Sequence, residues 1–260
     1  MSCETIRVEQ DGRTAVVWLN RPKVHNAFND VMIRELREAF IGFAADASVR
    51  SVLLTGEGKS FCAGVDLKWL GGGREAPFEK HFAETLDLSR MFRAIYDLDK
   101  PVIAAVNGTA LGGGVGFLGV ADIVYAAEDA MLGLSEVKIG VVPACISPYL
   151  FIKSSQRSRL KEHFISGRRF SAAEGERAGL IDYVVARDRL LESALEKAAA
   201  LRNAAPLAQG MCKQLFRDVP GMSLDEAMRH TAEVLARLRT GDEARQGIDA
   251  FFAKREIDWR

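Results

Sequence analysis

The stretch Lys100–Gly119 reads KPVIAAVNGTALGGGVGFLG and holds the pattern that decides the fold. Its apolar run Pro101–Val106 predicts a buried strand, Asn107-Gly108 predicts a turn, and Gly112–Gly114 predicts the start of a helix. The first N–H groups of a helix lack internal partners and carry the positive end of the helix dipole. Glycines leave those groups uncovered, so the stretch predicts a binding place for a phosphate, a carboxylate or an oxyanion that forms during a reaction.

These glycines allow two other interpretations. Glycines also permit tight packing or a strained turn, and a lone pair would favour that reading. The segment Gly114–Gly119 further fits the G-x-G-x-x-G pattern of dinucleotide-binding proteins. That fingerprint should follow its strand directly and open a βαβ unit, whereas here a turn intervenes and a different repeat surrounds it. We therefore favour a backbone binding site over a dinucleotide site.

Composition favours catalysis on a small molecule. The chain has 260 residues, with 35 Lys+Arg against 35 Asp+Glu and no basic block, so neither nucleic acid nor an anionic membrane is an expected partner. The four cysteines and four histidines lack the spacing of disulfide frameworks or metal sites, so no metal is expected. The first ten residues have no apolar signal region, and no run is long enough to span a bilayer. These features predict a cytoplasmic protein.

The pattern of the opening stretch recurs along the chain. Ser51–Thr55 is a predicted strand followed by a turn and the small residues of SFCAGVDLKWL, and Ile123–Ala127 is followed by a turn and a second short strand over Met131–Glu136. Successive units of this kind predict a coiled stack of ββα repeats, an α/β fold. An opening hairpin around Asp11-Gly12, a loop over Gly71–Gly73 and helices over residues 30–45 and 78–97 complete this half.

Beyond Pro143 the chain is predicted to be almost entirely helical. Ser171 and Ser223 each begin a capping-box sequence, which marks a helix start, and a last helix is expected over Asp242–Glu256. Tyr183–Val185 is a predicted short strand. The apolar faces of the last helices indicate either packing against another subunit or folding back on the chain's own core, and the pattern alone leaves both open.

Two segments could bring backbone N–H groups to one place. Phe61–Asp66 and Gly112–Gly116 each carry small residues to a helix start, and two converging amides would polarise a carbonyl and stabilise an enolate. Glu136 is the best proton carrier, because no other carboxylate lies between Asp129 and Glu162 and burial would raise its pKa. The alternative is a glutamate paired with Lys138. The remaining candidates, His81 and His163, are expected to be surface or packing residues.

Several motifs together resemble the enoyl-CoA hydratase/isomerase (crotonase) superfamily. They are SFCAGVDL at 60–67, NGTALGGG at 107–114 and SEVKIGVVP at 135–143, with further likeness from RPKVHNA at 21–27 to FFAKR at 251–255. The likeness is strongest to a 3-methylglutaconyl-CoA hydratase-like branch. It implies a crotonase-like spiral over residues 1–200 for CoA-ester binding and catalysis. It also implies a C-terminal helical oligomerisation region over 201–260 that builds a homotrimer or hexamer.

The resemblance also implies roles for single residues. The N–H groups of Val65 and Gly113 would form the oxyanion hole for the thioester carbonyl of an acyl-CoA or an acyl-carrier-protein substrate, with no cofactor besides coenzyme A as part of the substrate. Glu136 would carry the proton, and Asp66 would fix its loop. The positions implied in substrate and CoA binding are Lys23, His25, Ala27, Ala63, Asp66, Leu67, Lys68, Gly116 and Lys254 of the partner subunit.

One departure from the family pattern bears on the reaction. Hydratases of the family carry two glutamates, and Gly116 stands where the first is expected. Hydration or dehydration of a branched enoyl thioester, with part of the substrate filling the space beside Gly116, is the first expectation. Isomerisation of a Δ3-enoyl-CoA by one glutamate is the second, and a non-catalytic CoA-binding protein is the third.

Overall fold

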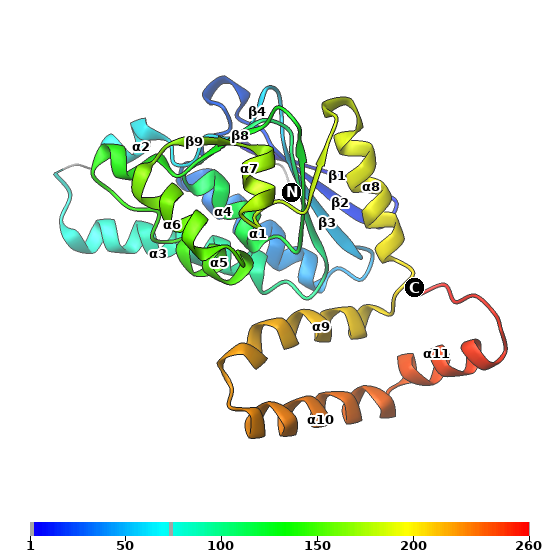
Figure 1. Cartoon of the computed structure of the whole chain (residues 1–260). Helices are drawn as coiled ribbons and strands as arrows, with labels where there is room; N and C mark the ends of the chain where they lie inside the picture. Colours follow the sequence, from blue (N-terminus) through cyan, green and yellow to red (C-terminus); the bar gives the residue numbers. More distant parts are fainter. Residues whose placement is uncertain (1–2, 73–74, 260) are drawn as a thin grey trace.

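The protein is an α/β fold of two sheets and surrounding helices, given by a computed structural model that describes residues 3–72 and 75–259 (Figure 1). The larger sheet has the order β1-β2-β3-β5-β7-β10, in which only β1 and β2 are antiparallel. The smaller sheet has the order β4-β6-β8-β9. The strands are β1 Ile6–Asp11, β2 Thr14–Leu19, β3 Ser51–Gly56, β4 Ser60–Cys62, β5 Val102–Val106, β6 Thr109–Leu111, β7 Ile123–Ala127, β8 Met131–Gly133, β9 Arg169–Ser171 and β10 Tyr183–Val185.

The predicted ββα repeat is confirmed and explains how the sheets form. In each of three passes the first strand (β3, β5, β7) joins the large sheet and the second (β4, β6, β8) joins the small one. Neighbouring passes pair in parallel, so equivalent points of each pass lie side by side. As a result, the residues that follow β4, β6 and β8 meet at one edge of the small sheet.

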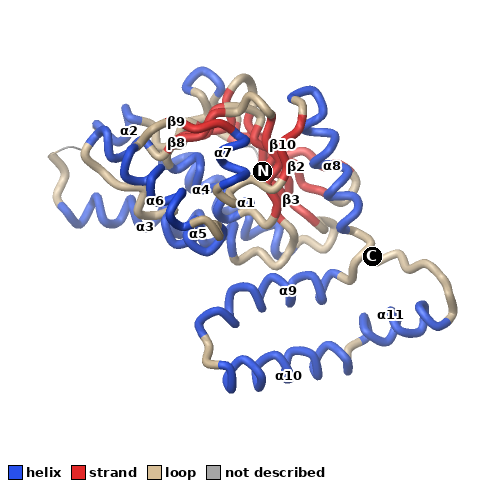
Figure 2. The backbone as a smooth tube through the Cα atoms, viewed as in Figure 1, coloured by secondary structure: helices blue, strands red, loops and turns tan. Residues whose placement is uncertain are grey.

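The helices lie around this spiral (Figure 2). The predicted hairpin and both capping boxes are confirmed, and Asn29 caps α1 by accepting a hydrogen bond from the Met32 N–H. The helices are α1 Asp30–Ala45, α2 Leu67–Gly71, α3 Phe78–Tyr96, α4 Gly113–Val120, α5 Ser147–Lys153, α6 Arg157–Ser166, α7 Ala172–Arg177, α8 Leu190–Leu201, α9 Pro206–Asp218, α10 Leu224–Thr240 and α11 Asp242–Phe252, with 3-10 turns η1 Pro22–Val24, η2 Ser135–Ile139, η3 Arg187–Arg189 and η4 Val219–Gly221.

A few predicted boundaries were wrong. The strand expected over Met131–Glu136 ends at Gly133, and Glu136 lies in η2 instead. The last helix ends at Phe252, where Ala253 and a left-handed Lys254 turn the chain. Of the predicted Gly71–Gly73 loop, Gly71 ends α2 and Gly72 follows it, while Gly73 lies outside the described residues. None of the helices in the described parts of the chain is long and apolar enough to cross a bilayer.

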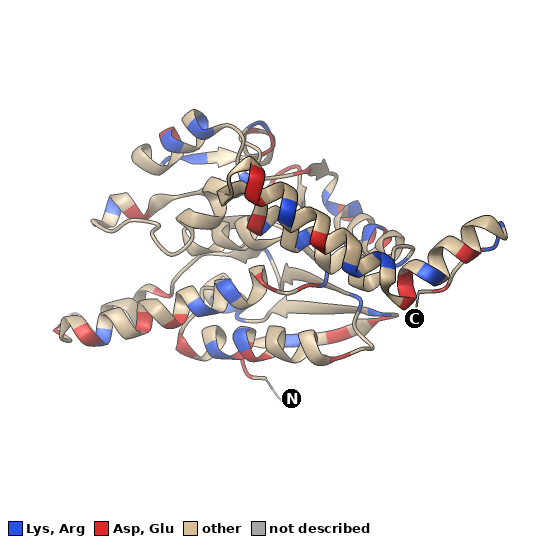
Figure 3. Ribbon diagram, turned by 90° about the horizontal axis from the view of Figure 1, so that it is seen from below, with Lys and Arg blue, Asp and Glu red and all other residues tan. Residues whose placement is uncertain are grey.

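The last three helices stand apart from the body. Helix α8 packs on strands β3, β5 and β7, whereas α9, α10 and α11, here called the C-terminal arm, extend beside the sheets (Figure 1). Lys, Arg, Asp and Glu alternate along the arm rather than gathering by sign (Figure 3). Large apolar side chains of the arm are nevertheless exposed, among them Phe216, Leu224, Phe251 and Phe252, each at least 78% exposed.

One buried arginine holds both ends of the arm. The Arg50 guanidinium donates to the Ala204 carbonyl just before α9, at 2.8 Å, and to the Trp259 carbonyl at the end of the tail. Arg13 donates to the same Trp259 carbonyl. The arm is therefore a closed loop whose two ends meet at the start of β3.

We predict that Arg50→Ala frees the arm while leaving the spiral folded. Its loss removes the Arg50 donor of the Ala204 carbonyl and one of the two donors of the Trp259 carbonyl, and a buried carbonyl left without a partner costs about 1–3 kcal/mol. Limited proteolysis should cut residues 202–259 several-fold faster than in the parent. Arg187→Ala, which removes an arginine that binds Asp129 and the Asn107 carbonyl within the body, is the control. Equal cleavage rates in the two variants would contradict this role of Arg50.

Candidate active site

The first candidate donor, the Val65 N–H, is held in place by a short backbone pairing. Val65 forms an isolated parallel bridge with Phe28. The Phe28 N–H donates to the Gly64 carbonyl at 2.9 Å, and the Asp66 N–H donates to the Phe28 carbonyl at 3.0 Å. Because successive N–H groups of an extended chain point to opposite sides, the Val65 N–H faces away from Phe28. Among the described residues it finds no hydrogen-bond acceptor.

The second candidate donor lies beside the first. Gly113 is the first residue of α4, and its N–H likewise has no acceptor within the described chain. The preceding Gly112 has φ +51°, a left-handed conformation that favours glycine. Gly64, at φ +85°, lies so near that a Cβ on it would stand 3.2 Å from the Gly113 nitrogen. The two segments predicted to converge are therefore in contact, and each offers a free N–H.

Glu136 lies next to the segment that carries the second amide. A Cβ placed on Gly112 would stand 2.9 Å from Glu136 Oε1, so the carboxylate rests on the residue that precedes Gly113. Its Oε2 is buried and has no hydrogen-bond partner in the described structure. Burial raises the pKa of Glu136. The alternative pairing with Lys138 is wrong: within the described residues no Lys138 charge acts on the Glu136 carboxyl, and the Lys138 side chain packs over Gly167.

The segment implied in CoA binding lies against the Val65 loop. The Ala63 N–H donates to the His25 carbonyl at 2.9 Å, and His25 Nδ1 lies 2.9 Å from Ser60 Oγ. Buried Asn26 donates to the Glu57 and Ser60 carbonyls. Lys23–Ala27 and Ala63–Lys68 thus run side by side, and the side chains of Lys23, His25, Leu67 and Lys68 are exposed while Ala27 is buried.

Asp66 takes a structural position. Its carboxylate caps α2 by accepting from the Lys68 N–H at 3.0 Å and pairs with Arg21 at 3.0 Å. Burial alone would raise the pKa of Asp66, but these hydrogen bonds and the Arg21 charge together lower it. A carboxylate held in this way is a poor proton carrier.

The remaining candidates are not brought to Glu136. His81 lies on α3, and His163 is buried with its ring stacked on Phe170, as expected of a packing histidine. Lys254 follows α11, the last helix of the C-terminal arm.

The expectation that Gly116 leaves room for substrate was wrong. A Cβ at Gly116 would stand 2.2 Å from Ile146 Cγ2 and 2.9 Å from the Phe92 ring, and both side chains are fully or almost fully buried. A Cβ at Gly119 would likewise meet Leu150 at 3.0 Å. The two glycines let α5 pack closely on α4. The sequence shows a missing side chain at 116 but not that Ile146, thirty residues later, fills the space.

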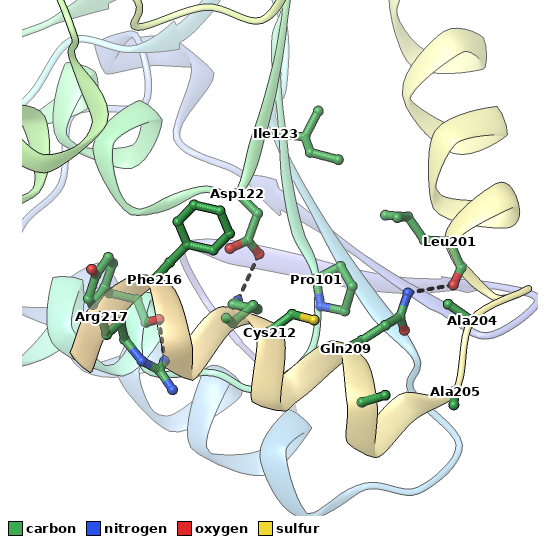
Figure 4. Close-up of a pocket in the computed structure, with 13 residues that line it drawn as sticks. Pro101, Asp122, Ile123, Leu201, Ala204, Ala205, Gln209, Cys212, Phe216 and Arg217 are labelled. Atoms are coloured by element: carbon green, nitrogen blue, oxygen red, sulfur yellow. Dashed lines mark hydrogen bonds and ion pairs between the residues drawn. The ribbon is translucent and has the colours of Figure 1, made fainter. Parts of the chain in front are cut away.

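An apolar pocket lies elsewhere. A cavity of about 480 Å³ separates the sheet from α9, and Asp122 and Lys213 form an ion pair of 2.7 Å in its wall (Figure 4). Burial lowers the pKa of Lys213, although the Asp122 charge opposes this. The cavity is lined by residues at the base of the arm and contains neither Glu136 nor the two free amides.

Comparison with known proteins identifies the family. The sequence model of the enoyl-CoA hydratase/isomerase family matches residues 9–260. The chain belongs to this family. It is 37% identical over 250 residues to a Thermus thermophilus protein provisionally named an enoyl-CoA hydratase, covering 96% of this chain and 98% of that one.

Further relatives agree with this assignment. A Salmonella typhimurium carnitinyl-CoA dehydratase is 35% identical, covering 99% of this chain and 98% of that one. A solved enoyl-CoA hydratase from Shewanella pealeana superposes with a TM-score of 0.93 at 32% identity, covering 98% and 96%. The fold is therefore the crotonase spiral, and the protein is an enzyme of the hydratase/isomerase type.

For this hydratase/isomerase family member we predict that Glu136→Gln lowers kcat by about 10²–10⁴, the usual worth of a positioned acid–base group, while leaving KM for an enoyl-CoA within a few-fold. The same variant should be more stable than the parent above neutral pH. Burial makes ionisation of this carboxyl less favourable in the folded state than in the unfolded state, so parent stability falls as pH rises from the ordinary glutamate pKa to the raised one, whereas glutamine carries no such cost.

Two measurements check this prediction. Steady-state turnover gives kcat, and thermal melting from pH 4 to 9 gives the stability difference, which should vanish below the ordinary glutamate pKa of 4.5. Turnover within threefold of the parent would remove Glu136 from the chemistry. A variant less stable than the parent at pH 8 would show that the buried carboxylate is structurally satisfied.

We further predict that Gly116→Ala destabilises the protein by about 1–3 kcal/mol, the usual cost of overpacking a core. Gly42→Ala is the matched control, because Gly42 also lies in a helix but a Cβ there meets nothing within 4 Å. It should stabilise the protein by up to about 1 kcal/mol. Urea denaturation measures both, and a Gly116→Ala variant as stable as the parent would show that Ile146 does not fill this space.

Proposed function

We propose that the protein hydrates enoyl-CoA thioesters, or dehydrates the corresponding 3-hydroxyacyl-CoA esters, with Glu136 as the only carboxylate that moves a proton. The observation that carries the proposal is the position of this carboxylate. It rests on Gly112, one oxygen has no partner, and the unpaired N–H groups of Gly113 and Val65 lie beside it. A buried, unsatisfied acid beside two free amides is costly to the fold and useful to a reaction.

In the proposed reaction the thioester oxygen accepts hydrogen bonds from the Val65 and Gly113 N–H groups. These donors stabilise the enolate that forms when water adds to the β-carbon, and each is worth about 3–4 kcal/mol in comparable sites. Glu136 takes a proton from the attacking water as the new C–O bond forms. It then delivers that proton to the α-carbon, so one O–H bond breaks, one C–H bond forms and the carboxylate is restored.

The relatives favour hydration over isomerisation, because their names are those of hydratases and a dehydratase. A single carboxylate also suffices to shift a double bond by removing a proton and returning it elsewhere, so isomerisation of a Δ3-enoyl-CoA is the second candidate. Both reactions pass through the same enolate. Gly116 gives no support for a branched acyl chain, because Ile146 and Phe92 fill the space in which the branch was expected to lie.

The proposal extends to binding and assembly. We place coenzyme A along the exposed side of Lys23–Ala27 and Ala63–Lys68, with a phosphate contact from Lys254 of the partner subunit. The exposed apolar residues of the arm support residues 201–260 as the surface that joins subunits into a trimer or hexamer. Sedimentation of the intact chain at the mass of one subunit would contradict that assembly.

Turnover of a panel of CoA esters, followed by mass spectrometry, separates the candidates. We predict that 2-enoyl-CoA esters gain about 18 Da, while 3-enoyl-CoA esters change only slowly, because Glu136 is proposed to move a proton between water and the α-carbon and not to the γ-carbon. The panel should include straight, branched and carboxylated acyl groups, each also tested on an acyl carrier protein. Rapid double-bond shift without any gain of water would assign the enzyme as an isomerase. Glu136→Gln serves as the blank.

A further inference from the structure

The two free amides come from different repeats, so some contact must fix the distance between them. Val65 follows β4 and Gly113 follows β6, and no hydrogen bond in the described chain joins one amide's residue to the other. An oxyanion hole works only when both donors lie about 2.7–3.1 Å from one point. One residue, Phe28, contacts both segments. The inference below rests on the proposed function.

Phe28 holds the Val65 segment through its backbone. Its N–H and carbonyl bind Gly64 and Asp66, the residues on either side of Val65. This pairing fixes the direction of the Val65 N–H without using it. Because the contact is made by main-chain atoms, it survives a change of the Phe28 side chain.

Phe28 holds Gly113 through its ring. A Cβ on Gly113 would stand 2.4 Å from Phe28 Cζ and 3.1 Å from Cε1, so the tip of the ring lies directly against the Gly113 backbone. The ring is fully buried and meets Phe92 and Phe117 edge-on, with centroids 6.4 and 6.2 Å away. Phe117 belongs to α4, as Gly113 does. The Phe28 ring therefore fills the space between the Phe28 backbone and the start of α4.

From these contacts we infer that Phe28 is a positioning residue that sets the spacing of the two oxyanion donors. Its backbone fixes one donor and its ring tip fixes the other, so the length of the side chain sets the gap between them. Interiors are close-packed, and a shortened side chain lets the start of α4 move toward the space. Such a movement displaces the Gly113 N–H from the reacting carbonyl. It lowers the rate of the chemical step more than it weakens the binding of substrate.

The test compares Phe28→Leu with Phe61→Leu. Phe61 is equally buried and also packs edge-on against Phe117, but the three atoms nearest to a Cβ on Gly113 all belong to the Phe28 ring. Leucine lacks the Cε and Cζ atoms that touch Gly113. Both variants should lose similar thermal stability. Only Phe28→Leu should lose kcat, by about 10-fold or more, with KM within threefold, and only it should move the infrared C=O stretch of a bound ¹³C-labelled thioester toward its value in water.

A second substitution makes the spacing role explicit. In the parent, Gly113→Ala drives a methyl into the Phe28 ring; in the Phe28→Leu background that methyl has room. The loss of kcat caused by Gly113→Ala should therefore be several-fold smaller in the double variant than in the parent. Phe28→Met, which keeps most of the volume, replaces Phe28→Leu if the latter does not fold.

The outcomes separate this inference from the proposed function. Equal losses of kcat in the Phe28 and Phe61 variants, or an unmoved C=O stretch in Phe28→Leu, would overturn the role of Phe28 while the oxyanion hole stands. Additive effects of Phe28→Leu and Gly113→Ala would overturn it as well. A parent enzyme whose bound thioester shows no C=O shift from water would instead overturn the oxyanion hole itself.

Discussion

The structure depends on keeping two backbone N–H groups unpaired and next to each other. Buried backbone N–H groups are almost always hydrogen-bonded in proteins. Two can stay free here because the backbone groups that flank them are hydrogen-bonded and hold the chain in place. The Phe28–Val65 bridge uses the groups on either side of Val65, and the Gly112 N–H donates to Gly133 at 2.7 Å. Left-handed glycines at 64 and 112 then bring the two loops together. The parallel pairing of successive ββα passes places these two loops side by side.

A missing hydrogen bond also distinguishes the Glu136 carboxylate. The third pass of the spiral delivers it to the edge where the first two passes leave their amides, and burial there leaves one carboxylate oxygen without a partner. Such a group weakens the fold at neutral pH and is useful only in chemistry. Asp66, the residue after Val65, shows the contrast: with a capping bond and an arginine partner it stabilises a loop.

Much of this could be predicted from the sequence, because the signals were local. The hairpin, the helix caps, the repeat and the isolation of Glu136 each depend on residues close together in the chain. Gly116 was misread because its neighbour Ile146 belongs to a later helix, and nothing local reports it. Phe28 looked like any core aromatic residue, since its contact with Gly113 exists only in the folded state. Arg50, which holds both ends of the arm, was missed for the same reason.

The most direct test of the account is a crystal structure with an unreactive acyl-CoA thioester bound. We expect the thioester oxygen to lie about 2.7–3.1 Å from both the Val65 and the Gly113 nitrogens. The free Glu136 oxygen should face the α- and β-carbons of the acyl group. A thioester bound in the pocket beneath α9, or one whose carbonyl points away from both amides, would contradict it.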